Sequence, residues 1–356
     1  MFDPEFRPGD NLYSNALLAI DSQDGNMNWY FQYTPGDYLD YDEVGIHQLV
    51  DEVGKVEALI RKGAQLFTTK DRIDEFKSLG FTEAKNVEIA YQEAQVIIDC
   101  TPSGNSNWES IYSKLSTDKL FLAQGSEHGF GPFFVWGINN EILEENLNKI
   151  LIASCNTHNM ASVIKTFAID SQETLEKANF VCMRRSNDVS QNEGYSPSPT
   201  VTEHKIEQYG THHARDVAEL FKQSDIELNL FSSAIQIPTQ YMHTLWFNLE
   251  FSSDITYDKV IAKLDESVDL TSTEKLSSNK VFSFGRDHGY HGRILSHGVI
   301  VKKSISVENN TLTGFCFTPQ DGNALLSSVA ASLHKFNPSD WESKMKIFDK
   351  YIYKNI

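Results

Sequence analysis

The chain has 356 residues, of which 40% are hydrophobic and 12% aromatic, enough for two domains with a sizeable core. Its net charge of -18, from 31 Lys and Arg against 49 Asp and Glu, argues against nucleic acid as the main partner. No apolar run approaches the roughly 20 residues of a membrane span, four cysteines without a CxxC pair exclude a disulfide framework, and the polar N-terminus does not resemble a signal peptide. We therefore expect a globular, reduced, cytoplasmic protein.

The first half of the chain predicts strands that alternate with helices. The clearest segment is 94–104, an apolar, β-branched run that ends in a Pro-Ser-Gly turn and is typical of a buried parallel strand. Residues 23–45 are rich in Asp, Tyr and turn residues and are the hardest to assign. Strands are also expected over 15–22, 64–69 and 119–125, and helices over 46–63, 70–80 and 107–115. This alternation favours a parallel α/β sheet.

The second half predicts longer strands, which are typical of a mixed α+β domain. A hairpin is expected over 304–317, turning at Asn309 and Asn310. The Pro- and Ser-rich stretch 188–204 predicts a long loop. Further strands are expected over 179–185, 231–240 and 241–252, with a helix over 257–267 and two helices at the C-terminus, the second beginning with the capping-box pattern of residues 339–342.

Cys155 lies where an apolar run meets a helical pattern, in the segment ILIASCNTHNMASVI of residues 150–164. The first backbone N–H groups of a helix lack partners within the helix, so they stabilise a thiolate and make a cysteine at this position nucleophilic near neutral pH. Ser154 is a candidate cap for the same turn. The alternative is that Cys155 packs in the core, because free cysteine is among the most buried residue types.

Three other segments carry groups that such a nucleophile and a phosphorylated substrate need. Arg184 and Arg185 end a predicted strand. His212 and His213 lie in a predicted loop, and His243 enters an apolar strand. Guanidinium groups bind phosphate, and an imidazole beside a thiol acts as a base. Taken singly, each has a structural explanation: a solvated strand end, a surface loop and a core histidine with its hydrogen bonds satisfied.

Six segments follow one another in a specific order: VIIDCTPSG, AQGSEH, SCNTHNM, MRRSND, THHARD and IPTQYMH. This series resembles the type II, archaeal-type glyceraldehyde-3-phosphate dehydrogenases. That family carries a strand ending in D-x-T-P-x-G, then F-Q-G-G-E-K-H, the nucleophile turn S-C-N-T-T-G-L, an R-R pair, H-H-G-P-D, and V-P-T-T-x-M-H. The resemblance covers roughly Val56 to Ser332, and it rests on the whole series because any single segment is weak.

The resemblance implies a role for each matching residue. Cys155 would attack an aldehyde to form a thiohemiacetal, and His243 would be the base that takes its hydroxyl proton as hydride leaves. Inorganic phosphate would then release the thioester as an acyl phosphate. Residues implied to hold the substrate phosphate and the attacking phosphate are Asn156, Thr157, Arg184, Arg185, His212 and His213. Residues implied to approach NAD or NADP are Pro102, Gly104 and Gln124.

The resemblance also implies the architecture and the partners. We expect a degenerate Rossmann-like parallel-sheet domain over residues 1–153, with the C-terminal helices of 321–356 packed back on it. An α+β catalytic domain with a mixed or antiparallel sheet is expected over 154–320. The partners expected are a small phosphorylated metabolite and further copies of the chain, a tetramer by analogy with the family, but no nucleic acid and no membrane.

The sequence departs from the family in the segment that binds the cofactor and in the nucleophile turn. It contains no G-x-G-x-x-G, and residues 1 to about 55 do not match the family's first βαβ unit. The family's Thr-Gly-Leu is His158-Asn159-Met160 here. Two hypotheses remain: a dehydrogenase-like enzyme that acts on a phosphorylated aldehyde, or a divergent member without dehydrogenase turnover that binds, regulates or supports an assembly.

A histidine cluster near the C-terminal third was weighed as a metal site. Asp287, His288, His291 and His297 fall within twelve residues of one another, but nothing in their spacing fixes a coordination geometry. We expect a polar loop and no metal.

Overall fold

The computed structural model describes residues 63–101, 103–125, 127–186, 196–239, 241–288 and 294–356, together with residues 57, 60 and 61 and the backbone of two N-terminal strands. Those strands are β1 (Ala16–Ile20) and β2 (Met27–Gln32), which pair antiparallel. The predicted strand over 15–22 is confirmed by β1, whereas β2 falls in the stretch 23–45, which is the hardest to assign from the sequence. Most of the predicted helix 46–63 lies outside the described residues.

A parallel four-stranded sheet forms one half of the molecule, as predicted. Its strands are β5 (Val96–Asp99), β6 (Leu120–Gly125), β8 (Lys149–Ala153) and β7 (Phe133–Phe134), in the order β5-β6-β8-β7. Helix α4 (Gly104–Ser110) connects β5 to β6. Alternate residues of these apolar strands point to opposite faces, and both faces are buried.

Smaller elements precede this sheet in the chain. They are β3 (Phe67–Thr68), α2 (Ile73–Ser78), β4 (Lys85–Asn86) and α3 (Val87–Glu93). β3 and β4 pair parallel. The predicted helix over 70–80 is confirmed in its central part, and Gly80 follows its end with the positive φ of 96° that glycine adopts without strain.

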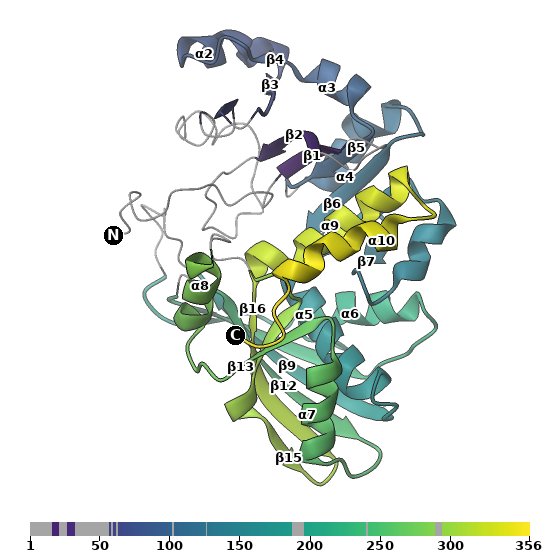
Figure 1. Ribbon diagram of the computed structural model, residues 1–356, viewed down its shortest axis with the longest axis vertical. Coiled ribbons are helices and arrows are strands. Elements are labelled where there is room, and N and C mark those ends of the chain that lie inside the picture. Colours follow the sequence, from purple (N-terminus) through teal and green to yellow (C-terminus); the bar gives the residue numbers. More distant parts are fainter. Residues whose placement is uncertain are drawn as a thin grey trace.

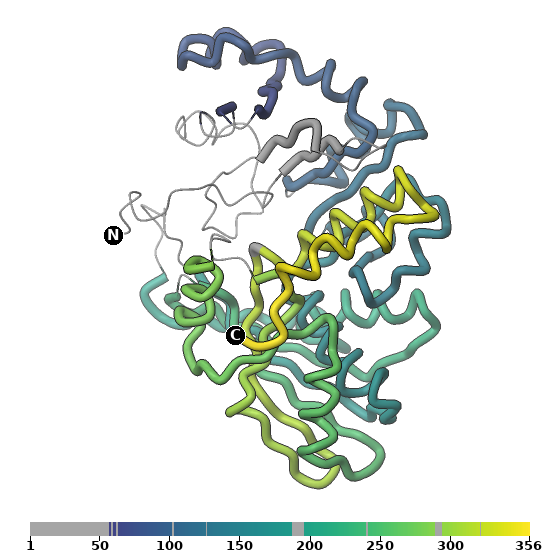
Figure 2. Tube along the Cα trace, in the orientation of Figure 1, coloured from purple at the N-terminus to yellow at the C-terminus, as the bar shows by residue number. Residues whose placement is uncertain are grey.

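The C-terminal segment returns to the parallel sheet. Helix α9 (Gln320–Phe336) and helix α10 (Trp341–Met345) share a core with Ile98, Leu122 and Ile152 on one face of that sheet. Figure 1 shows α9 and α10 lying across β6 and β7, and Figure 2 shows the same yellow segment beside the blue-green one. The capping box expected at residues 339–342 is wrong, because α10 begins after Asp340 and no side chain caps it.

A mixed eight-stranded sheet forms the other half. Its path is β10-β11-β9-β12-β16-β14-β13, with β15 paired to β16. The longest strand, β9 (Leu175–Arg185), runs parallel to β11 and antiparallel to β12. The other strands are β10 (Thr200–Val201), β11 (Leu230–Ile237), β12 (His243–Phe251), β13 (Leu270–Thr273), β14 (Gly298–Val301), β15 (Ser306–Glu308) and β16 (Thr311–Thr318).

Helices cover one face of the mixed sheet. They are α5 (Cys155–Ile164), continued by a π-helical turn over Lys165–Ile169, α6 (His212–Lys222) and α7 (Tyr257–Glu266). Helix α8 (Ser278–Asp287) lies near the C-terminus of the chain (Figure 1). The hairpin predicted at Asn309 and Asn310 is confirmed by β15 and β16, with Asn309 at a φ of 52°.

The core of the mixed sheet continues into the parallel sheet. Phe121 and Leu151 of the parallel sheet belong to the same buried cluster as Met160 of α5, Phe180 of β9 and Phe247 of β12. The two sheets are therefore joined by packing around α5, and Cys155, its first residue, lies at this junction. The domain boundaries at 153/154 and 320/321 stay predictions. Among the described residues, no helix is both long and apolar enough to cross a membrane.

Candidate active site

Cys155 is the first residue of α5, directly after β8. The Ser154 hydroxyl accepts a hydrogen bond from the Thr157 N–H at 3.4 Å, as expected of an N-cap. Cys155 is half-buried, whereas Cys100, Cys182 and Cys316 are buried. Burial raises the pKa of the Cys182 thiol to about 12 and raises that of Cys316 further. Cys155 thus differs from the three other cysteines in exposure and in its place at a helix start.

Asn156 and Thr157, the next two residues of α5, form hydrogen bonds with other side chains of the protein. Asn156 accepts a hydrogen bond from the Thr318 hydroxyl at 3.3 Å, and its amide nitrogen lies 3.3 Å from His213 Nε2. The Thr157 hydroxyl lies 2.9 Å from that of Ser154. Both residues are almost fully buried. Asn156 therefore connects the nucleophile turn to α6 and to β16, while Thr157 belongs to the cap.

His212 and His213 begin α6, so the prediction that they lie in a loop is wrong. Their ring centroids are 4.0 Å apart, and the Thr211 hydroxyl lies 3.1 Å from His213 Nδ1. Burial and the positive charges of Arg184 and Arg215 lower the pKa of His212 to about 4. Burial, with His212, Arg184 and His243, lowers the pKa of His213 well below its usual value. Both rings are neutral at pH 7, so they offer hydrogen bonds rather than charge.

Arg184 and Arg185 are adjacent at the end of β9, and their side chains lie on opposite faces of the sheet. Strand alternation puts Arg184 on the same face as the buried Cys182 and puts Arg185 on the opposite face. The charge of Arg184 acts on Cys182, His212 and His213. The backbone N–H of Arg185 donates to His243 Nδ1 at 3.0 Å. The structure thus places the Arg184 charge beside the histidines, and it brings Arg185 into contact with His243 through its backbone.

His243 begins β12 and is buried, with an exposed fraction of 2%. The Arg185 contact favours the tautomer of the neutral ring with its proton on Nε2. The amide nitrogen of Gln320, which only donates, lies 2.9 Å from Nε2, and the Gln320 oxygen accepts from the His243 N–H at 3.2 Å. Donors therefore face both ring nitrogens: Nε2 can donate only when the Gln320 nitrogen turns away, and Nε2 can act as a base only when the ring loses its contact with the Arg185 N–H.

The nucleophile turn and His243 are connected through two neighbouring elements. Thr318, which donates to Asn156, lies directly opposite His243 in the β12–β16 pair. One turn along α9 from Gln320, the amide of Asn323 donates to the Cys155 carbonyl at 2.8 Å. The structure therefore brings Cys155, Asn156, His213 and His243 together at the junction of the two sheets.

The turn after β5 is held by Asp99, which is buried at the strand's end. Its carboxylate accepts from the Thr101 N–H at 2.7 Å, from the Asn107 amide at 2.8 Å and from the Tyr112 hydroxyl at 3.0 Å. These three bonds fix the entry to α4. They explain why the sequence places an aspartate at the end of an otherwise apolar strand.

Two of the three predicted cofactor residues contact polar side chains of the chain itself. A Cβ at Gly104 would lie 3.3 Å from the Glu127 side chain, whose carboxylate accepts from the Asn105 N–H at 3.1 Å. The Gln124 amide donates to the Ser328 hydroxyl of α9 at 3.0 Å. Pro102 lies outside the described residues. The space beside Gly104 is therefore filled by the side chains of Ala123 and Glu127.

The sequence did not reveal the polar face of α9. Gln320, Asn323, Ser327 and Ser328 contact His243, Cys155, His158 and Gln124 respectively. The signal was present as polar residues three and four positions apart in an otherwise apolar helix. We read the segment only as a C-terminal helix.

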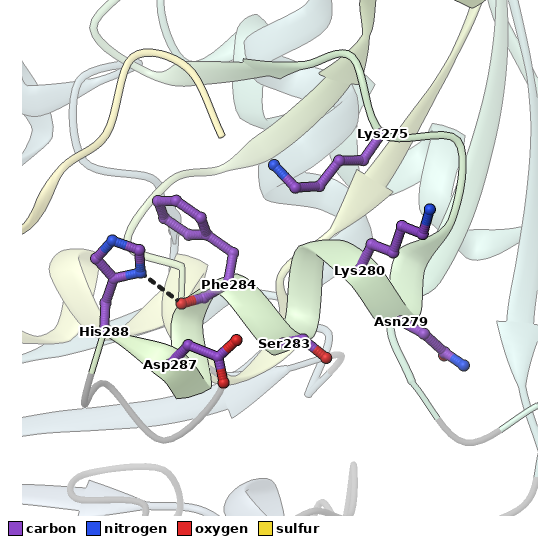
Figure 3. A pocket seen from close by; sticks show the side chains of 7 residues that line it. All are labelled: Lys275, Asn279, Lys280, Ser283, Phe284, Asp287 and His288. Carbon is purple, nitrogen blue, oxygen red and sulfur yellow. Dashed lines mark hydrogen bonds between the residues drawn. The ribbon is translucent and has the colours of Figure 1, made fainter.

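The predicted histidine cluster is dispersed. His288 ends α8 and its Nδ1 lies 2.8 Å from the Phe284 carbonyl of its own helix, beside an open pocket lined by Lys275, Lys280 and Asp287 (Figure 3). His297 is buried and its Nδ1 lies 2.8 Å from the Ser162 hydroxyl, so the prediction of a polar loop is wrong at this residue. His291 lies outside the described residues, among which no cluster of metal ligands occurs.

The comparisons with known proteins point to one family. A glyceraldehyde-3-phosphate dehydrogenase of Sulfolobus acidocaldarius is 27% identical over 260 residues, which are 71% of this chain and 73% of the relative. Glyceraldehyde-3-phosphate dehydrogenase 1 of Methanosarcina barkeri is 25% identical over 275 residues, 76% and 78% of the two chains. The glyceraldehyde-3-phosphate dehydrogenase of Methanobrevibacter smithii is 25% identical over 300 residues, 82% and 86%.

The chain is a relative of the archaeal-type glyceraldehyde-3-phosphate dehydrogenases. No family model matches it. A parallel-sheet α/β part and a mixed-sheet part with helices agree with the fold expected from that relationship. The chain differs from the family's nucleophile turn at His158 and Asn159.

Proposed function

We propose that this glyceraldehyde-3-phosphate dehydrogenase-like chain carries out covalent chemistry at Cys155 on a small phosphorylated aldehyde or acyl compound. The observation that supports this most is the junction of α5, α6, β12 and α9, where Asn156, His213, His243 and Asn323 surround the first turn of α5. Buried polar groups are costly unless they are paired. Their concentration around a half-buried cysteine favours a site of chemistry over a packing position.

In the proposed reaction, the Cys155 thiolate adds to the carbonyl carbon of the aldehyde. A C–S bond forms, the carbonyl π pair moves to oxygen, and the resulting oxyanion needs a donor. His243 Nε2–H supplies that donor in the tautomer that keeps the Arg185 N–H contact at Nδ1, once the amide nitrogen of Gln320 turns away from Nε2. The base role that the resemblance implies for His243 requires the other tautomer and stays a prediction.

Arg184 is the proposed partner of the substrate phosphate. Its charge contributes to the lowered pKa values of His212 and His213, which supports a phosphate site that these three residues share. Neutral imidazoles beside an arginine can donate hydrogen bonds to phosphate oxygens without adding charge. Asn156 and Thr157 are almost fully buried and bound within the chain, so they support the turn and contact phosphate only if it displaces their present partners.

The resemblance implies NAD or NADP as the acceptor of the hydride. The chain retains one part of the family's cofactor site and lacks another. Glu127, beside Gly104 at the start of α4, stands at the position of the Glu in the family's F-Q-G-G-E-K-H, and Gln124 is bound to Ser328. The G-x-G-x-x-G turn is absent from the sequence, and a residue with a Cβ prevents the close backbone approach that this turn provides.

These observations favour a second candidate function, in which the chain has no dehydrogenase turnover. Such a protein would keep the cysteine site for binding or acyl transfer and would act as a regulatory or structural subunit. The first candidate predicts that glyceraldehyde 3-phosphate with NAD+ or NADP+ and phosphate gives reduced cofactor, and that Cys155→Ser abolishes the signal. Reduced cofactor formed equally by Cys155→Ser would contradict the proposal, and none formed by either protein would select the second candidate.

We also propose that the chain forms a homo-oligomer through the face of the mixed sheet that α5, α6 and α7 leave uncovered. That face carries half-buried or exposed Val181, Trp246 and Phe315, and apolar sheet faces of this kind are typical of subunit contacts. Light scattering on the purified chain should give more than one protomer, and Trp246→Glu should shift it to monomer. A monomeric wild-type protein would contradict this proposal.

A further inference from the structure

Helix α9 carries a single polar face that contacts the active-site junction. Its members are Gln320, Asn323, Ser327 and Ser328, spaced three, four and one residues apart, which keeps them on one side of an α-helix. Asn323 and Ser327 have no exposed surface. Four buried or half-buried polar residues need partners: Gln320 finds one in β12, Asn323 and Ser327 in α5, and Ser328 in β6.

Asn323 makes the contact nearest to the nucleophile. Its amide nitrogen donates to the Cys155 carbonyl at 2.8 Å and lies 3.3 Å from the His297 carbonyl. The Cys155 carbonyl belongs to the first turn of α5, where helices fray most easily because their terminal groups lack partners. A donor from another helix fixes the orientation of this peptide and therefore the direction of the Cys155 side chain.

The neighbouring residues of the same face extend this support. The Ser327 hydroxyl lies 2.8 Å from His158 Nε2 and accepts from the Trp136 N–H at 2.9 Å. His158 Nδ1 in turn lies 3.0 Å from the carbonyl of Ser154, the residue before Cys155. The two residues that begin the nucleophile turn are thus each held from α9, one directly and one through His158.

Gly322 allows the first turn of α9 to lie close to the segment before β14, and so places the polar face of α9 within reach of α5. A Cβ at Gly322 would lie 2.1 Å from the Ile294 carbonyl oxygen, so any other residue would push the first turn of α9 away from the segment before β14. Apolar residues of α9 pack on the parallel sheet behind it. The polar face is therefore held at a fixed distance from the start of α5.

We propose that Asn323 is a positioning residue that fixes the Cys155 peptide and thereby sets the reactivity of the Cys155 thiol, with Ser327 acting in the same way through His158. The proposal rests on the proposed function of Cys155 as the reactive thiol. It assigns to the C-terminal helix a part in the chemistry, in addition to its packing on the parallel sheet.

Peptide-resolved alkylation with iodoacetamide across pH tests this proposal on the full chain. Asn323→Ala should lower the plateau rate at Cys155 about tenfold, and it should raise the pH midpoint towards the free-thiol value of about 8.5, because the first turn of α5 loosens. Ser327→Ala should give a smaller change in the same direction. Ser332→Ala is the matched control, since its hydroxyl donates to the Ser328 carbonyl of its own helix.

The buried Cys182 and Cys316 report unfolding in the same experiment. They should stay protected in Asn323→Ala while Cys155 slows. A Cys155 rate and midpoint equal to those of the wild type would overturn the positioning role, and so would faster labelling of all cysteines, which would show that Asn323 only holds the fold together. A wild-type Cys155 that reacts no faster than a free thiol would contradict the proposed function instead, so the two failures are distinguishable.

Discussion

The two sides of the active-site junction differ in how far they retain the family's chemistry. On the nucleophile side, Cys155 begins α5 under the Ser154 cap, and Asn156, His213 and His243 lie around it. On the side of the β5–α4 turn, Glu127 fills the space beside Gly104, and Ser328 binds Gln124. One side carries a half-buried thiol with neutral polar groups around it, and the other carries a carboxylate beside Gly104.

Helix α9 contacts both sides. Asn323 binds the Cys155 carbonyl, and Ser328 binds Gln124, five residues further along the same helix. The contact with Cys155 and the contact with Gln124 use different residues of α9. A rearrangement of the β5–α4 turn therefore need not change the position of Cys155. We therefore expect a substitution at the β5–α4 turn to leave the contact between Asn323 and Cys155 in place.

The largest effect of a single substitution on ligand binding is expected from the phosphate partner on the nucleophile side. Arg184→Ala should weaken protection of Cys155 by glyceraldehyde 3-phosphate about 30-fold, since a hydrogen-bonded charge on an anion contributes about 2 kcal/mol. Alkylation rates measured over a range of substrate concentrations give this affinity. Arg185→Ala is the control, because its backbone N–H contacts His243 and remains in place. Equal protection in wild type and Arg184→Ala would remove Arg184 from the site.

Acid should destabilise the junction through its buried histidines. Burial lowers the pKa of His158 and that of His297 to about 3, below the unfolded value of about 6.5. The stabilisation they confer is complete above pH 6.5 and declines as pH falls towards 3, by about 1.4 kcal/mol per pH unit for each ring. Burial raises the pKa of Asp216 to about 6, which acts in the opposite direction and offsets part of the loss.

Urea unfolding should therefore give a free energy about 2 to 4 kcal/mol lower at pH 5 than at pH 7. Replacing His158 and His297 together by Gln should reduce this dependence, whatever it costs in overall stability, while the lowered pKa values of His212 and His213 should maintain the remainder. The same slope in wild type and the double variant would show that these two rings do not stay neutral in the folded state.

The smallest effect is expected on the side of the β5–α4 turn. Glu127→Gln removes the carboxylate charge while keeping an oxygen that can accept from the Asn105 N–H. We expect calorimetric affinity for NAD+ or NADP+ to rise only several-fold, roughly 1 kcal/mol, because the G-x-G-x-x-G turn is still missing. Tight binding by the wild-type protein would contradict this expectation.

The sequence predicted the parts of this molecule that depend on local pattern. The apolar run before Asp99 and the change of pattern at Cys155 predicted a buried strand and a helix start, because burial on both faces and an N-cap leave clear local signals. The helix at His212 was missed because Thr211 caps nothing with its side chain. The role of Asn323 was missed because its partner lies 168 residues away in sequence, a distance at which no pattern of spacing operates.

The contact between Gly104 and Glu127 is a second example of a feature that the local sequence pattern does not predict. A glycine after a strand predicts close approach of some group, and the resemblance assigned that group to a cofactor. The structure shows the approaching group to be Glu127, 23 residues further along the chain. The sequence pattern does not tell whether a cofactor or the Glu127 side chain occupies this space, because either group requires that residue 104 has no Cβ.

Acylation of Cys155 without any cofactor tests the central claim most directly. An acyl phosphate such as 3-phosphoglyceroyl phosphate should transfer its acyl group to the Cys155 sulfur, forming a C–S bond and releasing inorganic phosphate as the C–O bond breaks. Mass spectrometry of the intact protein and its peptides should show one acyl group, located on Cys155 and absent from Cys155→Ser. An unmodified Cys155, or acyl groups spread equally over the buried cysteines, would contradict the account.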